Sequence, residues 1–530
     1  MSESSPRLAR SAGLFGLATM TSRLLGLVRD QVLAFYFGAG DAMDAFRVAF
    51  RVPNLLRDLF AEGAMSAAFV PTFTKALARG GRPRAWELAS SVMSALVLIT
   101  SVLVVCAMLF AEPLVRLYAA DFAQVPGKLS LTVELTRIMA PFLTLVALAA
   151  VAMGMLNTLG HFFVPALSPA MFNIATIVMA LTLVPFAPLL GLQPIVIIAV
   201  STLVGGLAQL AVQWPPLRNE GFTYRPRLDF RDEGLRQVLL LMGPGTIGMA
   251  ATQMNVLVNT ILATGEGTGA VSWLDFAFRV MYLPIGLFGV SIAAASTPTL
   301  SRLAHAHDHA GMRSTVASAI GLMLALNVPA TFGLIVLAEP IVALIYQYGR
   351  FTASDTAATA AALQFYAIGL VGYSVVRIVS PVFYALDRSR VPVATSAASV
   401  LVNVVLNLVL VRAMGYRGLA LGTSVTAVLN AVLQFWLLRQ HLGGIDGTRI
   451  ANTFARILLA ASVMAVVAWG ADRAVPQLVA DTTPIARLLG VALTIGAALG
   501  ALAISSHVLR IQEFDEARRL VLRRFRRKRP

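Results

Sequence analysis

The sequence predicts an all-α polytopic membrane protein with about fourteen transmembrane helices. Hydrophobic residues make up 58% of the 530 residues and charged residues only 13%, about half the charged fraction of an ordinary soluble domain. Apolar runs of about 20 residues, each long enough to span a bilayer, recur along the whole chain. A β-barrel would show short alternating strands instead, so we expect helices throughout.

The apolar segments can be placed in chain order. The first is preceded by Arg7 and Arg10, like a signal peptide, but it is too long and contains charges, so we interpret it as a retained helix. The predicted helices are 11–37, 44–75, 85–111, 130–158, 164–187, 192–217, 234–263, 270–302, 313–338, 355–386, 391–411, 417–439, 452–471 and 485–508.

Four short motifs recur in order at an almost constant spacing of 227 to 232 residues. AFRV at 45–48 returns at 277–280, PTFTK at 71–75 as PTLSR at 298–302, AEPLV at 111–115 as AEPIV at 338–342, and VP at 164–165 again at 391–392. This indicates two six-helix repeats of the same orientation, with two extra helices after them. Transporters often bind their substrate between such halves.

The repeat also predicts the domain organisation. We expect a first lobe over residues 1–220, a second lobe over 221–445, and a C-terminal part over 446–530 with the last two helices and a basic tail. The single Cys106 lies in an apolar helix, so there is no disulfide framework.

Positive charge is concentrated on alternate loops. Basic residues collect around 75–84, 218–236 and the tail RRLVLRRFRRKRP, whereas loops 38–42 and 264–269 have none. Under the positive-inside rule both termini are cytoplasmic, as an even helix count requires. We expect the tail to meet anionic lipid headgroups rather than nucleic acid.

Charged residues inside the predicted helices need an explanation, because a charge at the bilayer centre costs about 2.5–3.5 kcal/mol. The first helix contains Arg23, Arg29 and Asp30. Asp44 begins the second helix, and Arg279 lies in the eighth, just before Pro284. The arginines of these helices are Arg23, Arg29, Arg47, Arg51, Arg57 and Arg279.

Two interpretations of these charges remain open. They pair internally, Asp44 with Arg47 and Asp30 with Arg23 or Arg29, and hold helices together, or they form a positive cavity for an anionic substrate. The excess of arginine favours the cavity, and arginine in particular favours phosphate, because its planar fork binds phosphate bidentately and stays charged when desolvated.

Other chemistry is poorly supported by the sequence. There is no GxxxxGK[ST] phosphate loop, the HAHDH stretch at 305–309 lies in a predicted loop, and no catalytic triad or metal-ligand spacing occurs in the helices. We therefore expect a transporter without cofactor or metal rather than an enzyme. Neutral amides such as Asn403 and Asn407 either hydrogen-bond between helices or ligate Na⁺.

The opening residues resemble the MurJ/MviN family of proposed lipid II flippases, within the MATE-like exporter superfamily. The resemblance is carried by SRLLGLVRDQVLA and FGAGDAMDAFRVAFRVPNLLRDLFAEGA, and in the eighth helix by RVMYLPIGLFG. Phe278 and Tyr282 stand where some relatives have acids. The residues that fit the family pattern are Arg23, Arg29, Asp44, Arg51, Arg57, Glu62 and Arg279.

The resemblance implies that an arginine-lined cavity holds the diphosphate of lipid II and that Asp30 and Glu62 are candidate gating residues. It implies a monomer in the bacterial cytoplasmic (inner) membrane, working by alternating access, with the last two helices forming a groove for the polyprenyl tail. Two rivals stay open: a flippase for another polyprenyl-linked glycan, and a non-transporting scaffold of the cell-wall machinery.

Overall fold

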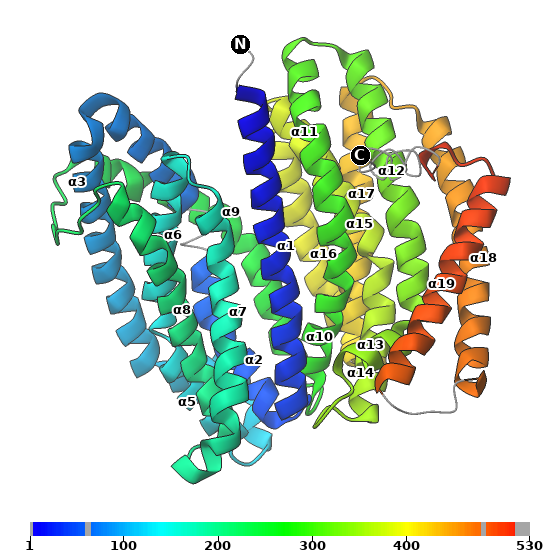
Figure 1. Cartoon of the computed structure of the whole chain (residues 1–530), viewed down its shortest axis with the longest axis horizontal. Helices are drawn as coiled ribbons and strands as arrows, with labels where there is room; N and C mark the ends of the chain where they lie inside the picture. Colours follow the sequence, from blue (N-terminus) through cyan, green and yellow to red (C-terminus); the bar gives the residue numbers. More distant parts are fainter. Residues whose placement is uncertain (1–3, 59–64, 479–483, 515–530) are drawn as a thin grey trace, which may run out of the picture. The chain divides into compact units, whose positions relative to one another are not determined.

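A computed structural model describes residues 4–58, 65–478 and 484–514, and over these ranges every regular element is helical. The helices form two compact units. The first comprises Met1–Ser272 with Gly349–Phe351, and the second comprises Trp273–Tyr348 with Thr352–Pro530 (Figure 1).

The first unit contains nine helices and two short 3₁₀ segments within the described residues. In chain order these are α1 (Ser4–Phe37), α2 (Asp41–Arg57), α3 (Met65–Leu109), α4 (Ala111–Tyr118), η2 (Ala120–Gln124), α5 (Lys128–Met139), α6 (Phe142–Thr158), α7 (Phe163–Leu183), η3 (Val184–Leu190), α8 (Pro194–Asn219) and α9 (Glu233–Thr264).

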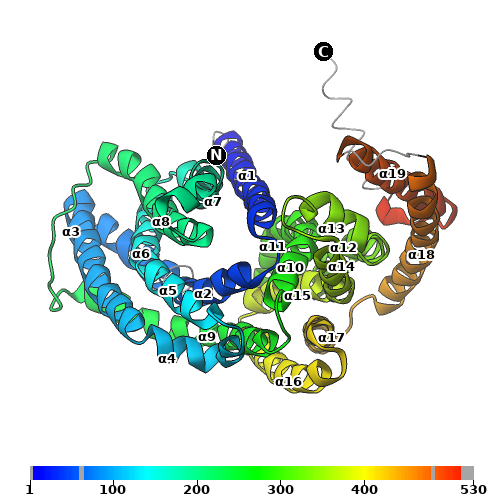
Figure 2. The ribbon, with the colours of Figure 1, turned by 90° about the horizontal axis from the view of Figure 1, so that it is seen from below.

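Within this unit α7 packs against both α1 and α8, and α3 packs against α6 and α9 (Figures 1 and 2). Phe69, Phe73 and Leu88 of α3 lie at the centre of a buried cluster that includes Phe222 and Leu235. The helix α3 is broken at Gly81, whose φ of +63° only glycine adopts without strain. The predicted helices 44–75 and 85–111 therefore become α2 and the two parts of α3.

The second unit contains the remaining helices. They are α10 (Ala270–Pro284), which starts in the first unit, the π-helical turn η4 (Ile285–Gly289), α11 (Val290–His305), α12 (His309–Val336), α13 (Ala338–Tyr346), α14 (Ala353–Ile368), α15 (Leu370–Ala385), α16 (Arg390–Met414), α17 (Tyr416–His441), α18 (Gly447–Leu478) and α19 (Pro484–Val508).

Small side chains let the helices of the second unit approach closely. Ala460, Ala461 and Ala468 of α18 are buried in a cluster with α12, α15 and α17, and α19 packs along α18 (Figure 2). Lipid is as apolar as these side chains, so close packing rather than water exclusion holds such helices together.

Apart from 44–75, which crosses residues outside the described ranges, each predicted transmembrane segment coincides with a helix, part of a helix or two consecutive helices. Within the described residues, ten spans are long and apolar enough to cross a membrane, or eleven when α14 and α15, bent by 41°, count as one. The count of fourteen stays a prediction, because α1, α2 and α9 are not among these spans. The sequence did not predict the short helices α4 and α13.

Both short helices begin at a repeat motif, α4 at AEPLV and α13 at AEPIV. Each follows a long helix, and the VP motifs lie at the starts of α7 and α16. The duplication itself remains a prediction, as do lobes ending at 220 and 445. The compact unit extends past 220 because α9 packs on α3.

Candidate functional site

Asp30 of α1 is fully buried, and its Oδ1 atom accepts hydrogen bonds from two arginines. Arg29 donates through Nε at 3.2 Å and through a terminal nitrogen at 2.9 Å, and a terminal nitrogen of Arg47 in α2 lies 3.5 Å from the same oxygen. Both arginine side chains are at most 12% exposed. One carboxylate thus serves two guanidinium groups and links α1 to α2.

A second carboxylate is shared at the end of α2. Arg57 donates to Oδ1 of Asp58 through Nε at 3.0 Å and a terminal nitrogen at 2.7 Å. Gln253 of α9 donates to the other oxygen at 3.1 Å. Gln253, a neutral polar residue in the seventh predicted helix, therefore links α9 to the Arg57–Asp58 pair.

The other two arginines of this region differ in exposure. Arg23 is exposed on α1, near the point where Asn173 of α7 donates to the Ser22 carbonyl at 3.1 Å, and Arg51 of α2 is half-buried. Of the five arginines between positions 23 and 57, Arg29 and Arg47 pair with Asp30, and Arg57 pairs with Asp58. These five are Arg23, Arg29, Arg47, Arg51 and Arg57. Charge pairing that links helices is therefore present at Asp30, whereas Asp44 pairs with Lys128.

Asp44 has a different environment from the arginines. Its buried carboxylate accepts hydrogen bonds from Lys128 Nζ at 2.9 Å, from the Gly269 backbone at 2.7 Å, and from the backbone and hydroxyl of Ser272 at 3.1 and 2.6 Å. Lys128 also lies 2.8 Å from Asp41. Its ammonium lies 4.2 Å from the ring centroid of Phe122. Asp44 thus links α2 to the start of α5 and to the segment that contains Gly269 and Ser272.

The sequence analysis missed Lys128, because it is a single basic residue just before a predicted helix and its partner Asp44 is 84 residues away. The only signal was a positive charge in an otherwise uncharged stretch, VPGKLSL. The same end of the unit contains two loops predicted to share one side of the membrane. Thr268 of one donates to Asp41 of the other at 2.7 Å.

In the second unit, Arg279 is half-buried on α10, about one turn before Pro284. Phe278 and Tyr282, which stand where some relatives have acids, belong to an aromatic cluster. Phe278 stacks on Tyr282 with ring centroids 5.9 Å apart, and Tyr373 meets Phe278 edge-on. Arg377 of α15 donates to the Tyr282 hydroxyl. Tyr282 therefore engages a further arginine, which the sequence did not identify as a site residue.

Glu62, a candidate gating residue, lies outside the described residues. Within the described ranges, no group of three or more His, Cys, Asp or Glu residues is arranged to hold a metal ion. Asn407 donates to Asn403 within α16 at 2.9 Å, and Asn403 donates to Thr426 of α17 at 3.2 Å, so the amide of Asn403 hydrogen-bonds between helices.

These features define a polytopic helical membrane protein with paired and clustered arginines on its first two helices. The class is confirmed by structure comparison. The chain superposes on a solved structure described as "Lipid II flippase MurJ, inward closed conformation" with a TM-score of 0.78 and 26% identity, covering 94% of this chain and 99% of that one. A multidrug resistance MATE family transporter of the MOP superfamily, 16% identical, shares the fold with a TM-score of 0.68, covering 81% of this chain and 98% of that one.

Sequence comparison identifies the family. The family model described as "Lipid II flippase MurJ" matches residues 33–488. A probable lipid II flippase MurJ from Vibrio cholerae is 34% identical over 470 residues, covering 87% of this chain and 88% of the relative. The chain therefore belongs to the MurJ family of lipid II flippases.

Proposed function

We propose that this protein flips lipid II from the cytoplasmic to the outer leaflet of the bacterial inner membrane by alternating access. Lipid II is an undecaprenyl diphosphate that carries a disaccharide-pentapeptide. The proposal is supported by family membership across residues 33–488 and by the arginines of α1 and α2, of which Arg29, Arg47 and Arg57 pair with Asp30 and Asp58.

The arginines are the proposed diphosphate ligands. A guanidinium has five N–H donors, so Arg29 and Arg57 can hold an aspartate and still donate to a phosphate oxygen. Asp30 and Asp58 would keep the arginines oriented and lower the electrostatic cost of their burial when no substrate is bound. Arg23 and Arg51 are proposed as further phosphate donors, and Arg279 of α10 is proposed as a diphosphate ligand in its own right.

The role proposed for Asp44 follows from its contacts. Its two oxygens already accept hydrogen bonds from four donors of the protein, and a carboxylate adds repulsion to any anionic substrate. We therefore propose that Asp44 holds α2, the start of α5 and the segment around Gly269 together. It would support substrate binding by fixing the position of these segments and not by direct contact with the substrate.

The proposed topology places both termini in the cytoplasm, with two parallel six-helix repeats followed by α18 and α19. The contacts between the basic segments around residues 75–84 and 218–236 of the first unit support this topology. Arg82 pairs with Glu220 at 2.7 Å and Arg84 pairs with Asp232 at 2.7 Å, so predicted cytoplasmic segments meet one another. The loops without basic residues meet at Asp41 and Thr268 instead.

Complementation tests the function. When a bacterium's own lipid II flippase is depleted, this chain should restore growth and cell shape. Failure to restore growth, with the protein present in the membrane, would contradict the proposal. Restoration by a variant with Arg23, Arg29, Arg57 and Arg279 all changed to Ala would favour the scaffold interpretation, because a scaffold needs no diphosphate ligands.

A further inference from the structure

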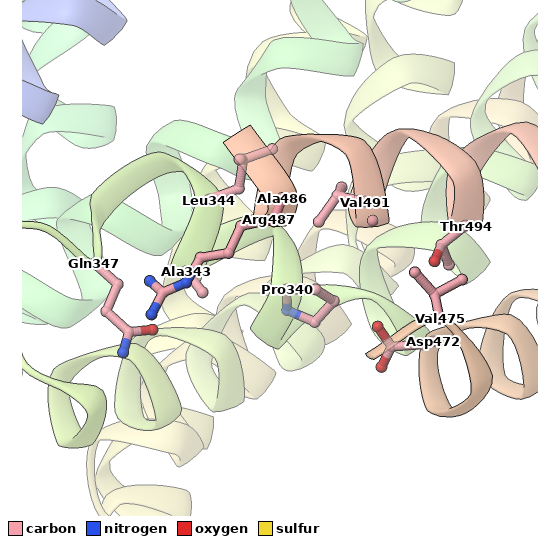
Figure 3. A pocket seen from close by; sticks show the side chains of 11 residues that line it. Pro340, Ala343, Leu344, Gln347, Asp472, Val475, Ala486, Arg487, Val491 and Thr494 are labelled. Carbon is pink, nitrogen blue, oxygen red and sulfur yellow. The ribbon is translucent and has the colours of Figure 1, made fainter. Parts of the chain in front are cut away.

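A cavity of about 330 Å³ lies within the second unit, between the short helix α13 and the two last helices (Figure 3). Its wall is apolar where Pro340 and Leu344 of α13 face Val491 of α19. Gly490 lets α19 approach α18, because a Cβ atom there would lie 3.3 Å from Val475. The cavity is thus built by close helix packing, with a mostly apolar wall and a few polar side chains.

The cavity has opposite charges on its two sides. In Figure 3, Arg487 and Gln347 lie on one side of Pro340, and Asp472 and Thr494 lie on the other. No ion pair or hydrogen bond joins Asp472 or Arg487 to another side chain of the described ranges. Glu339 at the start of α13 is close enough for its charge to act on Asp472, so the anionic side carries two carboxylates.

Both charges lie near the ends of candidate membrane spans. The apolar span of α18 is Gly447–Val475 and that of α19 is Ile485–Val508, so Asp472 and Arg487 lie within a few residues of span ends. Snorkelling to water is the ordinary fate of such residues. Arg487 is exposed and Asp472 is half-buried, and both side chains line one cavity. Leu488, Leu489 and Leu493 of α19 are more than half exposed beside it.

A ligand that fits these features has a negative group, a positive group and apolar chains. A diphosphate, or an anionic phospholipid, would meet Arg487 favourably but would be repelled by Asp472 and Glu339. An amine-bearing zwitterionic phospholipid satisfies both sides, because its phosphodiester accepts hydrogen bonds from guanidinium and its ammonium donates to carboxylates.

We propose that this cavity binds the headgroup of a zwitterionic phospholipid with a primary ammonium. The phosphodiester lies against Arg487 and Gln347, the ammonium against Asp472, and the acyl chains run along the exposed leucines of α19. The site is independent of the proposed transport function, and in the proposed topology it lies in the outer leaflet.

The test is lipid binding to the full-length purified protein in detergent, measured by native mass spectrometry during titration with phosphatidylethanolamine, phosphatidylcholine or phosphatidylglycerol. The ethanolamine lipid should bind at least about tenfold more tightly than the choline lipid, whose trimethylated nitrogen cannot donate to Asp472. Asp472→Asn should remove most of this preference, and Arg487→Gln should weaken ethanolamine-lipid binding about tenfold.

The matched control is Arg473→Gln. Arg473 is the exposed neighbour of Asp472 and its guanidinium lies 3.8 Å from the Trp469 ring centroid, outside the cavity lining. It should leave lipid binding unchanged. Equal binding of ethanolamine and choline lipids to the unaltered protein, or an unchanged preference in Asp472→Asn, would overturn the proposal. Displacement of the ethanolamine lipid by an equal concentration of a polyprenyl diphosphate would also overturn it and assign the cavity to that lipid.

Discussion

Lys128 shows how a single residue can hold several segments of this membrane protein together. It is only 3% exposed, and its ammonium lies between Asp41 and Asp44, while Asp44 also accepts from the loop that contains Gly269. A buried charge is tolerated only when it is paired and hydrogen-bonded, so loss of one partner leaves the others without compensation.

We predict that Lys128→Met destabilises the protein by about 3–5 kcal/mol, because two neighbouring carboxylates lose their counter-charge. Thermal unfolding of the purified protein in detergent measures this. The control is Lys75→Met, since Lys75 is exposed and its removal should change stability by less than about 0.5 kcal/mol. Equal loss of stability in the two variants would contradict the structural role of Lys128.

At this scale the sequence could identify charges but not their partners. Arg29, Asp30 and Arg57 were found because charge is conspicuous in an apolar helix. The sequence could not assign Gln253 to Asp58, because 195 residues separate them and only folding brings them together.

At the scale of helices, glycines set how closely neighbours pack. A Cβ atom on Gly372 of α15 would lie 2.7 Å from the backbone of Ala427 in α17, a distance that side-chain movement cannot relieve. On Gly333 of α12 the nearest atom would be a methionine methyl group at 4.0 Å. The two positions therefore differ in packing although both are helical glycines.

Gly372→Ala should accordingly destabilise the second unit by about 1–3 kcal/mol, because α15 and α17 must separate. Gly333→Ala should be neutral or slightly stabilising, since alanine favours helix. The yield of folded protein and its thermal unfolding temperature check both. Similar behaviour of the two variants would show that α15 and α17 are not packed as described.

The start of α9 is stabilised by Asp232, which accepts from the Leu235 backbone at 3.0 Å and pairs with Arg84 at 2.7 Å. Burial raises the pKa of this carboxyl, but the hydrogen bonds from Leu235 and Arg84 and the charge of Arg84 outweigh it, so its pKa lies below the ordinary value of 3.8. The stability it contributes is therefore complete above the ordinary pKa and is lost as pH falls through the lowered one.

We predict that Asp232→Asn, which keeps a helix-capping side chain, lowers stability at pH 7 by up to about 1 kcal/mol, because Arg84 is partly exposed. The difference from the unaltered protein should be constant from pH 8 to 5 and shrink only below the ordinary aspartate pKa. Thermal unfolding across this pH range measures it, with Glu233→Gln, an exposed neighbour, as control. A difference that grows on acidification would contradict the lowered pKa.

Long apolar segments made the principal helices predictable, because a 3.6-residue helix is the only way for them to satisfy the backbone in lipid. The short helices α4 and α13 were missed since eight or nine residues give too weak a pattern. The break at Gly81 depends on local backbone geometry, which composition does not report.

At the scale of the whole molecule, the orientation in the membrane follows from the distribution of Lys and Arg. We predict that a single cysteine at Gln193 is labelled by an impermeant thiol reagent in intact cells and that one at Arg227 is labelled only after permeabilisation. Both residues are exposed, and Cys106 is first replaced by Ser. Labelling at position 227 in intact cells would reverse the topology.

The central claim is that arginines of α1 and α2 bind the diphosphate of lipid II while the chain moves it across the membrane. The most direct measurement is the fraction of lipid II accessible to an impermeant hydrolase in spheroplasts depleted of their own flippase. The unaltered chain should restore accessibility and Arg29→Ala should lower it about 10–100-fold, with partial recovery in Arg29→Lys, while Arg473→Gln behaves normally. Full accessibility with Arg29→Ala, or none with the unaltered chain, would contradict the account.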